Sequence, residues 1–210
     1  MGQDFRAIFG HDLAESDLPV LSATLDILTR DLVHYLEQLR LDTVSYPSPP
    51  SGWRWGWSPS NEPDLERWSK GESLSLSGIG SMMLNLGRHS VSFACWIRWT
   101  EFVSNKATQE AIREIVFRFA SQFRSPLAIY VPDSNSAAGE GAQNRVHDGA
   151  HLTDIIKYLA AQQPAATSID SILKSITTSV QGKIYETIDC DGYYIDRFED
   201  LKPIPIMRLR

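Results

Sequence analysis

The stretch Arg88-His89-Ser90-Val91-Ser92-Phe93-Ala94-Cys95-Trp96-Ile97-Arg98-Trp99-Thr100 decides the fold of this 210-residue chain. Side chains of an extended backbone alternate between two faces, so every second residue shares a side. Large apolar residues occupy one side, and small or polar residues occupy the other together with Trp96. This alternation predicts a central β-strand. The apolar side comprises Val91, Phe93, Cys95, Ile97 and Trp99.

Further elements are expected on both sides of this stretch. Upstream, Phe5–Phe9 alternates and predicts a short strand, while leucines at helical spacing predict a long helix over 18–41. Downstream, apolar periodicity predicts a helix over 108–124 and a short buried strand over 127–131. The remaining expected elements are a helix over 152–163, a helix over 168–180, and a hairpin that joins 183–188 to 193–195 through Asp191-Gly192.

These elements predict an α+β fold, with one domain over 1–210 and a central, mostly antiparallel or mixed sheet packed by several helices. Residues 43–64 form a Pro- and Trp-rich connection. Residues 134–149, rich in Ser, Asn, Ala and Gly, predict a long loop of the kind that is usually functional or mobile. Residues 74–86 stay open between helix and strand, because glycines within and beside them weaken both.

Composition narrows the classes of function. The formal net charge is -6, so the surface repels phosphate backbones, disfavours nucleic acid and favours a basic protein partner. No stretch approaches the roughly 20 apolar residues that span a bilayer, and no signal peptide is visible, so we expect no membrane association. The two cysteines provide no disulfide framework, which makes the cytoplasm the expected compartment. No cofactor motif is present, and no cofactor is expected.

The densest aromatic segment is Trp53-Arg54-Trp55-Gly56-Trp57, which holds half of the six tryptophans. In an extended backbone the three indoles share one side and Arg54 points to the other. One interpretation is the buried face of an edge strand. The other, favoured by the neighbouring glycines, is a shaped loop with exposed indole edges, because Trp and Arg are frequent anchors of protein interfaces. The residues expected to contact a protein partner here are Trp53, Arg54, Trp55 and Trp57.

Acidic residues crowd the C-terminal part of the sequence, with Arg197 as their one basic neighbour. One interpretation is a charged sheet edge that blocks edge-to-edge pairing with other chains. The alternative is a docking patch for a cationic protein surface. The residues expected to form this patch are Asp189, Asp191, Asp196, Glu199 and Asp200.

The segment His147-Asp148-Gly149-Ala150-His151 is the strongest candidate for catalysis. Two histidines four residues apart lie on one face of a helix, a spacing that can hold zinc, and Asp148 or Asp154 can supply a third ligand. The alternative interpretation makes Asp148 the N-cap of a helix over 149–162, with both histidines near a solvated helix end.

In the order of its segments the chain resembles bacterial immunity proteins of polymorphic toxin systems, which are small cytosolic neutralisers of secreted toxins. The resemblance implies a non-enzymatic α+β domain that binds a cognate toxin and occludes its active site. The segments that carry the resemblance are the Phe5–Phe9 strand, the long helix, the Arg88–Thr100 strand with the helix after it, Ile129-Tyr130-Val131-Pro132-Asp133 and Gly192-Tyr193-Tyr194-Ile195-Asp196.

The leading hypothesis is therefore a non-catalytic protein-binding domain, without catalytic, cofactor-binding or metal-binding residues, whose partner is a toxin domain with a basic surface. Two alternatives remain open. The first is a metal-dependent hydrolase built around His147, Asp148 and His151. The second is a structural subunit that forms homo-oligomers through the tryptophan segment.

Overall fold

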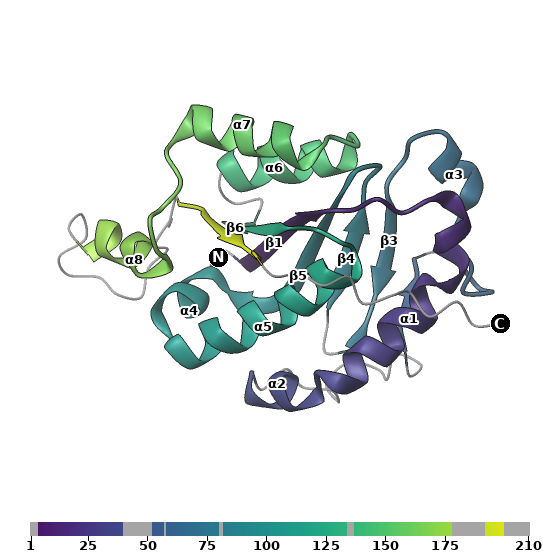
Figure 1. The fold of residues 1–210 in the computed structure, drawn as a ribbon, viewed down its shortest axis with the longest axis horizontal. Helices are drawn as coiled ribbons and strands as arrows, with labels where there is room; N and C mark the ends of the chain where they lie inside the picture. Colours follow the sequence, from purple (N-terminus) through teal and green to yellow (C-terminus); the bar gives the residue numbers. More distant parts are fainter. Residues whose placement is uncertain are drawn as a thin grey trace.

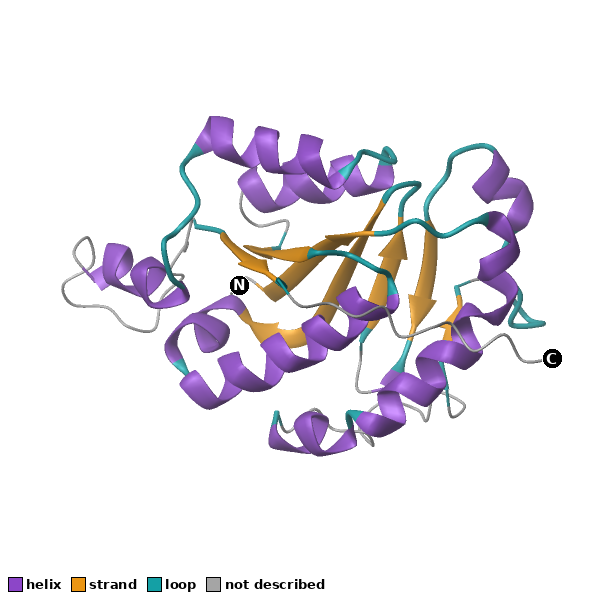
Figure 2. Cartoon of the chain, in the orientation of Figure 1, coloured by secondary structure: helices purple, strands orange, loops and turns teal. Residues whose placement is uncertain are grey.

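The computed structural model describes residues 4–39, 52–56, 58–79, 82–133, 137–177 and 192–199. These residues contribute seven strands to one sheet in the order β2-β3-β4-β5-β1-β6-β7, and every neighbouring pair is antiparallel (Figure 2). The predicted α+β fold with a central antiparallel sheet is confirmed. The strands are β1 (Asp4–Gly10), β2 (Arg54–Trp55), β3 (Leu74–Ser77), β4 (Met83–Leu86), β5 (Ser90–Arg98), β6 (Leu127–Pro132) and β7 (Tyr194–Arg197).

Helices cover both faces of this sheet (Figure 1). A 3-10 turn at Glu15–Asp17 precedes the first helix. The helices of the described residues are α1 (Leu18–Asp31), α2 (Val33–Gln38), α3 (Leu65–Ser69), α4 (Trp99–Ser104), α5 (Lys106–Gln122), α6 (Ala137–His147), α7 (Leu152–Gln162) and α8 (Ile169–Thr177).

Strand β1 lies inside the sheet, between β5 and β6. Its residue Ile8 pairs with Ser92 of β5 on one edge and with Ile129 of β6 on the other. Because both neighbours run antiparallel to β1, they run parallel to each other, and the connection between them contains α4 and α5. The predicted strands over 5–9 and 127–131 are confirmed. The predicted central strand is β5, which ends at Arg98 because α4 begins with the next residue.

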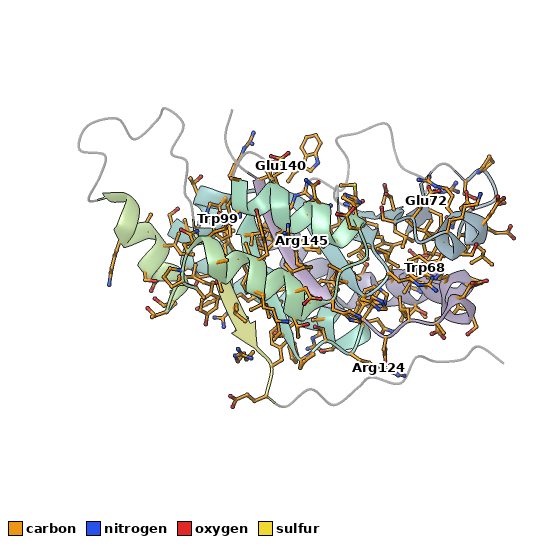
Figure 3. All side chains as sticks on the ribbon, turned by 90° about the horizontal axis from the view of Figure 1, so that it is seen from above. Trp68, Glu72, Trp99, Arg124, Glu140 and Arg145 are labelled. Carbon is orange, nitrogen blue, oxygen red and sulfur yellow. The ribbon has the colours of Figure 1, made fainter. Side chains whose placement is uncertain are left out.

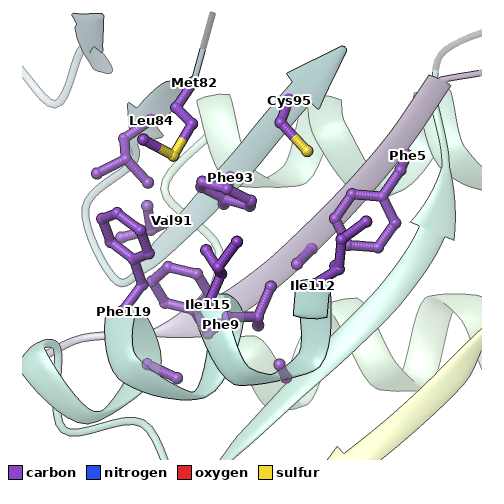
Figure 4. Packing of buried hydrophobic residues seen from close by; sticks show 14 of the residues in the cluster. Phe5, Phe9, Met82, Leu84, Val91, Phe93, Cys95, Ile112, Ile115 and Phe119 are labelled. Carbon is purple, nitrogen blue, oxygen red and sulfur yellow. The ribbon is translucent and has the colours of Figure 1, made fainter. Parts of the chain in front are cut away.

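Two hydrophobic cores form on the two faces of the sheet. The larger core lies under α1, α2, α4 and α5, where the rings of Phe93 and Phe119 pack with centroids 5.2 Å apart beside Phe9 (Figure 4). Cys95 is buried in this core as a free thiol. The smaller core lies under α6 and α7, where Ile8 packs with side chains of β6. The sheet is therefore the middle layer of three.

The predicted helix over 18–41 is interrupted once. Helix α1 ends at Asp31, and α2 begins at Val33 after Leu32, whose backbone torsions are φ -101 and ψ 0. The apolar face continues across the interruption, because Leu28, Leu32 and Leu36 are all buried. Residues 40 and 41 lie outside the described residues.

The predicted loop over 134–149 is wrong, because its residues Ala137–His147 form α6. One of the glycines that indicated a loop, Gly141, allows close packing of two helices instead. A Cβ at Gly141 would lie 1.9 Å from the hydroxyl of Tyr158 on α7, so the small residue lets the two helices approach. The guanidinium of Arg145 lies 3.6 Å from the centroid of the same ring. Tertiary packing thus stabilises a helix in a segment whose sequence has only a weak local preference for one.

The segments with ambiguous or turn-rich sequence form short strands. Residues 74–86 contain β3 and β4, and 43–64 contains the two-residue strand β2. Of the predicted closing hairpin, the first arm over 183–188 lies outside the described residues. The second arm includes β7, which pairs with β6. The predicted helices over 152–163 and 168–180 correspond to α7 and α8.

Replacement of Gly87 by alanine tests the contact between the β4–β5 turn and α6. A Cβ at Gly87 would lie 1.8 Å from the backbone oxygen of Val146, and backbone cannot move aside as a flexible side chain can. We expect Gly87→Ala to lower the free energy of unfolding by about 1–3 kcal/mol in urea denaturation. The control is Gly56→Ala, whose nearest atom would lie 3.4 Å away, at ordinary contact distance. Equal denaturation midpoints for the two variants would contradict this packing.

Candidate functional site

The sheet face that carries α6 and α7 is polar over β3, β4 and β5. Ser75 donates to the side-chain oxygen of Asn85 at 3.0 Å, and Ser90 donates to the backbone oxygen of Ala150 at 2.9 Å. Ser92 is fully buried on the same face. Figure 3 shows α6, which carries the labelled Glu140 and Arg145, lying across the strands. A polar layer therefore separates part of the sheet from this helix.

A chain of hydrogen bonds crosses this polar layer from β1 to the start of β3. Arg6 Nη1 donates to Gln143 Oε1 at 3.2 Å. The other amide atom, Gln143 Nε2, lies 2.7 Å from His147 Nε2. The second ring nitrogen, His147 Nδ1, lies 2.8 Å from Ser73 Oγ. Four side chains from β1, α6 and the residue before β3 are thus joined in one line.

Arg6 fixes the direction of every hydrogen bond in this chain. A guanidinium can only donate, so the amide oxygen of Gln143 faces Arg6 and its NH₂ group faces the imidazole. His147 Nε2 therefore accepts, and the proton of the neutral ring lies on Nδ1. That proton is donated to the hydroxyl oxygen of Ser73.

This direction is the reverse of what nucleophilic catalysis needs. A serine nucleophile donates its proton to a histidine that acts as the general base. Here Ser73 accepts from His147, so the ring nitrogen that faces the hydroxyl already carries a proton. The hydrogen bond between His147 and Ser73 thus holds α6 against the sheet.

Burial and charge both disfavour protonation of His147. Desolvation lowers the pKa of its imidazole, the positive charge of Arg6 lowers this pKa further, and Asp148 raises it. A second ring proton would also place an N–H against the NH₂ group of Gln143. Burial lowers the pKa of Arg6 itself, against the opposing charges of Asp133 and Asp4.

The predicted zinc spacing does not form, because the two histidines lie on different helices. Helix α6 ends at His147, and Gly149 with φ +74 turns the chain, so that His151 becomes the N-cap of α7. Asp148 is exposed and follows the end of α6, so its predicted role as an N-cap is also wrong. Among the residues that the structure describes, no three His, Cys, Asp or Glu side chains gather as metal ligands.

The expectation of exposed indoles is wrong for Trp53 and Trp55, which are only 1% and 3% exposed. Trp53 Nε1 donates to Thr29 Oγ1 on α1 at 2.8 Å, and its ring meets Phe119 edge-on. Arg54 points to the opposite side and is exposed, as the alternation predicts. The alternative interpretation, a buried strand face, is the correct one for these two tryptophans. Trp57 lies outside the described residues.

The predicted acidic patch loses one of its members to the interior. Asp196 on β7 is 8% exposed and accepts from Arg113 Nε at 2.7 Å and from Arg113 Nη2 at 3.0 Å. The hydroxyl of Tyr130 donates to the same carboxylate at 3.2 Å. Asp196 therefore ties β7 to α5 and is not a surface docking residue. Glu199 is exposed, and the other three expected residues, Asp189, Asp191 and Asp200, lie outside the described residues.

Sequence reasoning missed Trp96 as a candidate for binding. Its side chain is 65% exposed, more than any other large apolar side chain in the described part of the chain. It lies on β5, two residues before Arg98, whose guanidinium pairs with Asp4 of β1 at 2.7 Å. The available signal was a tryptophan on the polar side of an alternating strand.

An acidic groove lies between α2 and the start of α4 and α5. Its volume is about 860 Å³, and Glu101, Glu110 and Glu114 contribute carboxylates to its lining. Glu101 Oε1 accepts from Asn105 and Thr108, which hold this carboxylate in place. Glu114 pairs with Arg118 at 2.7 Å. The groove is suited to a positively charged group.

Comparisons with known proteins add no identity. No protein-family model matches the chain, and no curated protein or solved structure matches it. Within the described residues, the helices are too short or too polar to cross a membrane.

Truncation of Trp53 tests its assignment to the core. We expect Trp53→Ala to lower the free energy of unfolding by about 3–5 kcal/mol, because a large buried ring is replaced by a cavity. The variant also leaves the hydroxyl of Thr29 without its indole donor. Trp96→Ala is the control and should change stability by less than about 0.5 kcal/mol, as exposed positions usually do. Chemical denaturation of the two variants measures both values, and comparable stabilities would contradict the assignment.

Replacement of Arg6 tests the origin of the His147 pKa. We expect Arg6→Gln to raise the pKa of His147, because the variant removes a nearby positive charge. NMR titration of the imidazole protons measures this change, and exposed His34 on α2 serves as the internal control. In the wild type, the pKa of His147 is lower in the folded state than its unfolded value of about 6.5. The neutral ring therefore contributes its full stabilisation at pH values above about 6.5, and this contribution is lost as the pH falls through the folded pKa. An unchanged or lower pKa would show that Arg6 does not set it.

Proposed function

We propose that this chain is a binding protein that recognises another protein through the surface around Trp96. The observation that carries the proposal is the 65% exposure of this indole on a central strand. Tryptophan is the residue type most enriched among interface hot spots, because one side chain supplies a large rigid contact area. The proposed interface anchor is therefore Trp96, on the opposite side of the sheet from the buried Trp53 and Trp55.

The charge of the chain favours a cationic partner. The net charge is -6, and the groove lined by Glu101, Glu110 and Glu114 concentrates negative charge. Five peptide steps separate Trp96 from Glu101, so their Cα atoms lie no more than about 19 Å apart. Trp96 nevertheless points to the sheet face opposite the core that α2, α4 and α5 cover, so the groove adds to the negative field of the chain and is not part of the Trp96 surface. A lysine or arginine of the partner can also stack on the indole face.

The proposed biological role is that of an immunity protein, which acts in the bacterial cytoplasm by covering the active site of a cognate toxin. The resemblance in segment order supports this role. Binding of an exposed indole to a basic protein surface requires no catalytic group in the chain. Acidic rims speed association with a basic partner, and a desolvated aromatic anchor slows release.

Co-expression with the product of the neighbouring reading frame tests this function. The wild-type chain should restore growth of cells that produce the toxin, and purified chain should bind it in titration calorimetry. We expect Trp96→Ala to weaken binding by roughly 2 kcal/mol or more, which is about thirtyfold in Kd, and to reduce rescue. Ile27→Ala on α1 is the matched control, because it truncates an exposed apolar side chain away from the sheet.

Two results would contradict the proposal. The first is unchanged binding and rescue by the Trp96 variant, with its far-UV circular dichroism intact. The second is a wild-type chain that self-associates in sedimentation and becomes monomeric in Trp96→Ala, which would assign the indole to a homo-oligomer interface.

A further inference from the structure

The outer layer formed by α6 and α7 is fastened to the sheet by two interlocked turns. The β4–β5 turn at 87–89 meets the α6–α7 turn at 148–151. Ser90 Oγ donates to Ala150 at this junction, and a Cβ at Gly149 would lie 2.9 Å from Cβ of Arg88. The backbone of Gly87 also packs directly on that of Val146. Any loss of fit between the turns therefore loosens α6 and α7 together.

Two histidine rings stack across this junction. The rings of His89 and His151 lie 3.8 Å apart at an angle of 11°. A stack of two neutral imidazoles is favourable, whereas two imidazolium ions at this separation repel each other. Arg88 adds a further positive charge beside His89. Protonation of His89 is therefore disfavoured by the ring stacked on it and by Arg88 together.

A third histidine, His11, directly follows β1 and supports the β4–β5 turn. His11 Nε2 lies 2.8 Å from the carbonyl oxygen of Gly87, so this nitrogen carries a proton and donates. Its Nδ1 accepts from the backbone N–H of Leu13 at 3.2 Å and is therefore unprotonated. Protonation of Nδ1 would place two N–H groups against each other and break the bond to Leu13.

His147 completes the set from the α6 side, since its neutral ring links Gln143 to Ser73. Four of the five histidines in the chain thus hold the same junction or the same helix. His34, on α2, is the fifth and stacks on Tyr35.

We propose that His11, His89 and His147 form a pH-operated latch, which holds α6 and α7 on the sheet near neutral pH and releases them on acidification. His151 belongs to the latch as the ring on which His89 stacks. Release would uncover the smaller core, including Ile8 and Ile129, while the larger core on the other face stays packed. The inference rests on the junction alone and is independent of the role proposed for Trp96.

The charged groups around the latch set the direction of its response. His11 faces Asp12, which favours its protonation, and Arg88 and His89, which oppose it. His147 faces Arg6 and Asp148 with opposite effects, as described above. Burial is the largest influence and lowers the pKa of His11, His89 and His147. Because these folded pKa values lie below the unfolded ones, fastening is complete above about pH 6.5 and weakens as pH falls.

Hydrogen exchange of the full-length chain at several pH values tests the latch. Between about pH 7.5 and pH 5, the range in which histidines titrate, protection factors of α6 and α7 should fall by about tenfold or more after correction for intrinsic rates. Those of α5, which packs on the opposite face, should stay constant. Binding of a hydrophobic dye should rise over the same interval, because the smaller core becomes accessible.

A double variant and a matched control identify the titrating groups. His89→Gln with His151→Gln should retain about tenfold more protection of α6 and α7 than the wild type at the acidic pH, because the rings that repel are gone. His34→Gln should behave as the wild type. If the double variant loses its near-UV circular dichroism at neutral pH, His151→Gln alone replaces it, since one remaining ring cannot repel a partner.

Three outcomes would overturn the latch. The first is protection of α6 and α7 that does not change with pH. The second is a parallel loss in α5, which indicates global acid unfolding. The third is a folded glutamine variant that loses protection as readily as the wild type.

Discussion

Pairing of β1 with strands on both of its edges is the constraint on which the rest of the structure depends. Its backbone groups bond to β5 and β6, and its side chains alternate between the two cores, with Phe9 on one face and Ile8 on the other. Because a buried backbone group without a partner is costly, neither neighbour can separate from β1 without a large loss. Both helical layers are therefore positioned by one strand.

Arg6 on this strand sets the direction of the hydrogen bonds on the sheet face that α6 and α7 cover. By donating to Gln143 it orders the amide, the ring of His147 and the hydroxyl of Ser73 in one direction. The hydrogen bond between His147 and Ser73 therefore stabilises packing. The residue types alone, a histidine beside a serine, would instead indicate catalysis. Residue identity is thus insufficient to assign chemistry, and the direction of each hydrogen bond decides it.

The periodic spacing of apolar residues made most of the fold predictable. Contacts between residues far apart in the sequence left no local sequence signal and were not predictable. The alternation of 88–100 and the leucine spacing after residue 18 gave correct elements, because each buries one continuous face. Helix α6 was missed because its Gly141 allows contact with Tyr158, which follows later in the chain. The burial of Trp53 depends on Thr29 and Phe119, and that of Asp196 on Arg113. Trp96 was discernible, since its side of the strand is otherwise small or polar.

The order of the strands also bears on how the chain folds during synthesis. Strand β1 is synthesised before both of its partners, because Ile8 pairs with Ser92 and Ile129, which follow much later in the sequence. This apolar strand therefore remains unpaired until β5 has been synthesised and lacks its second partner until β6 has followed, and such long-range pairing slows folding. Until β6 follows, the second edge of β1 is unpaired, and unpaired strand edges with exposed apolar side chains promote aggregation.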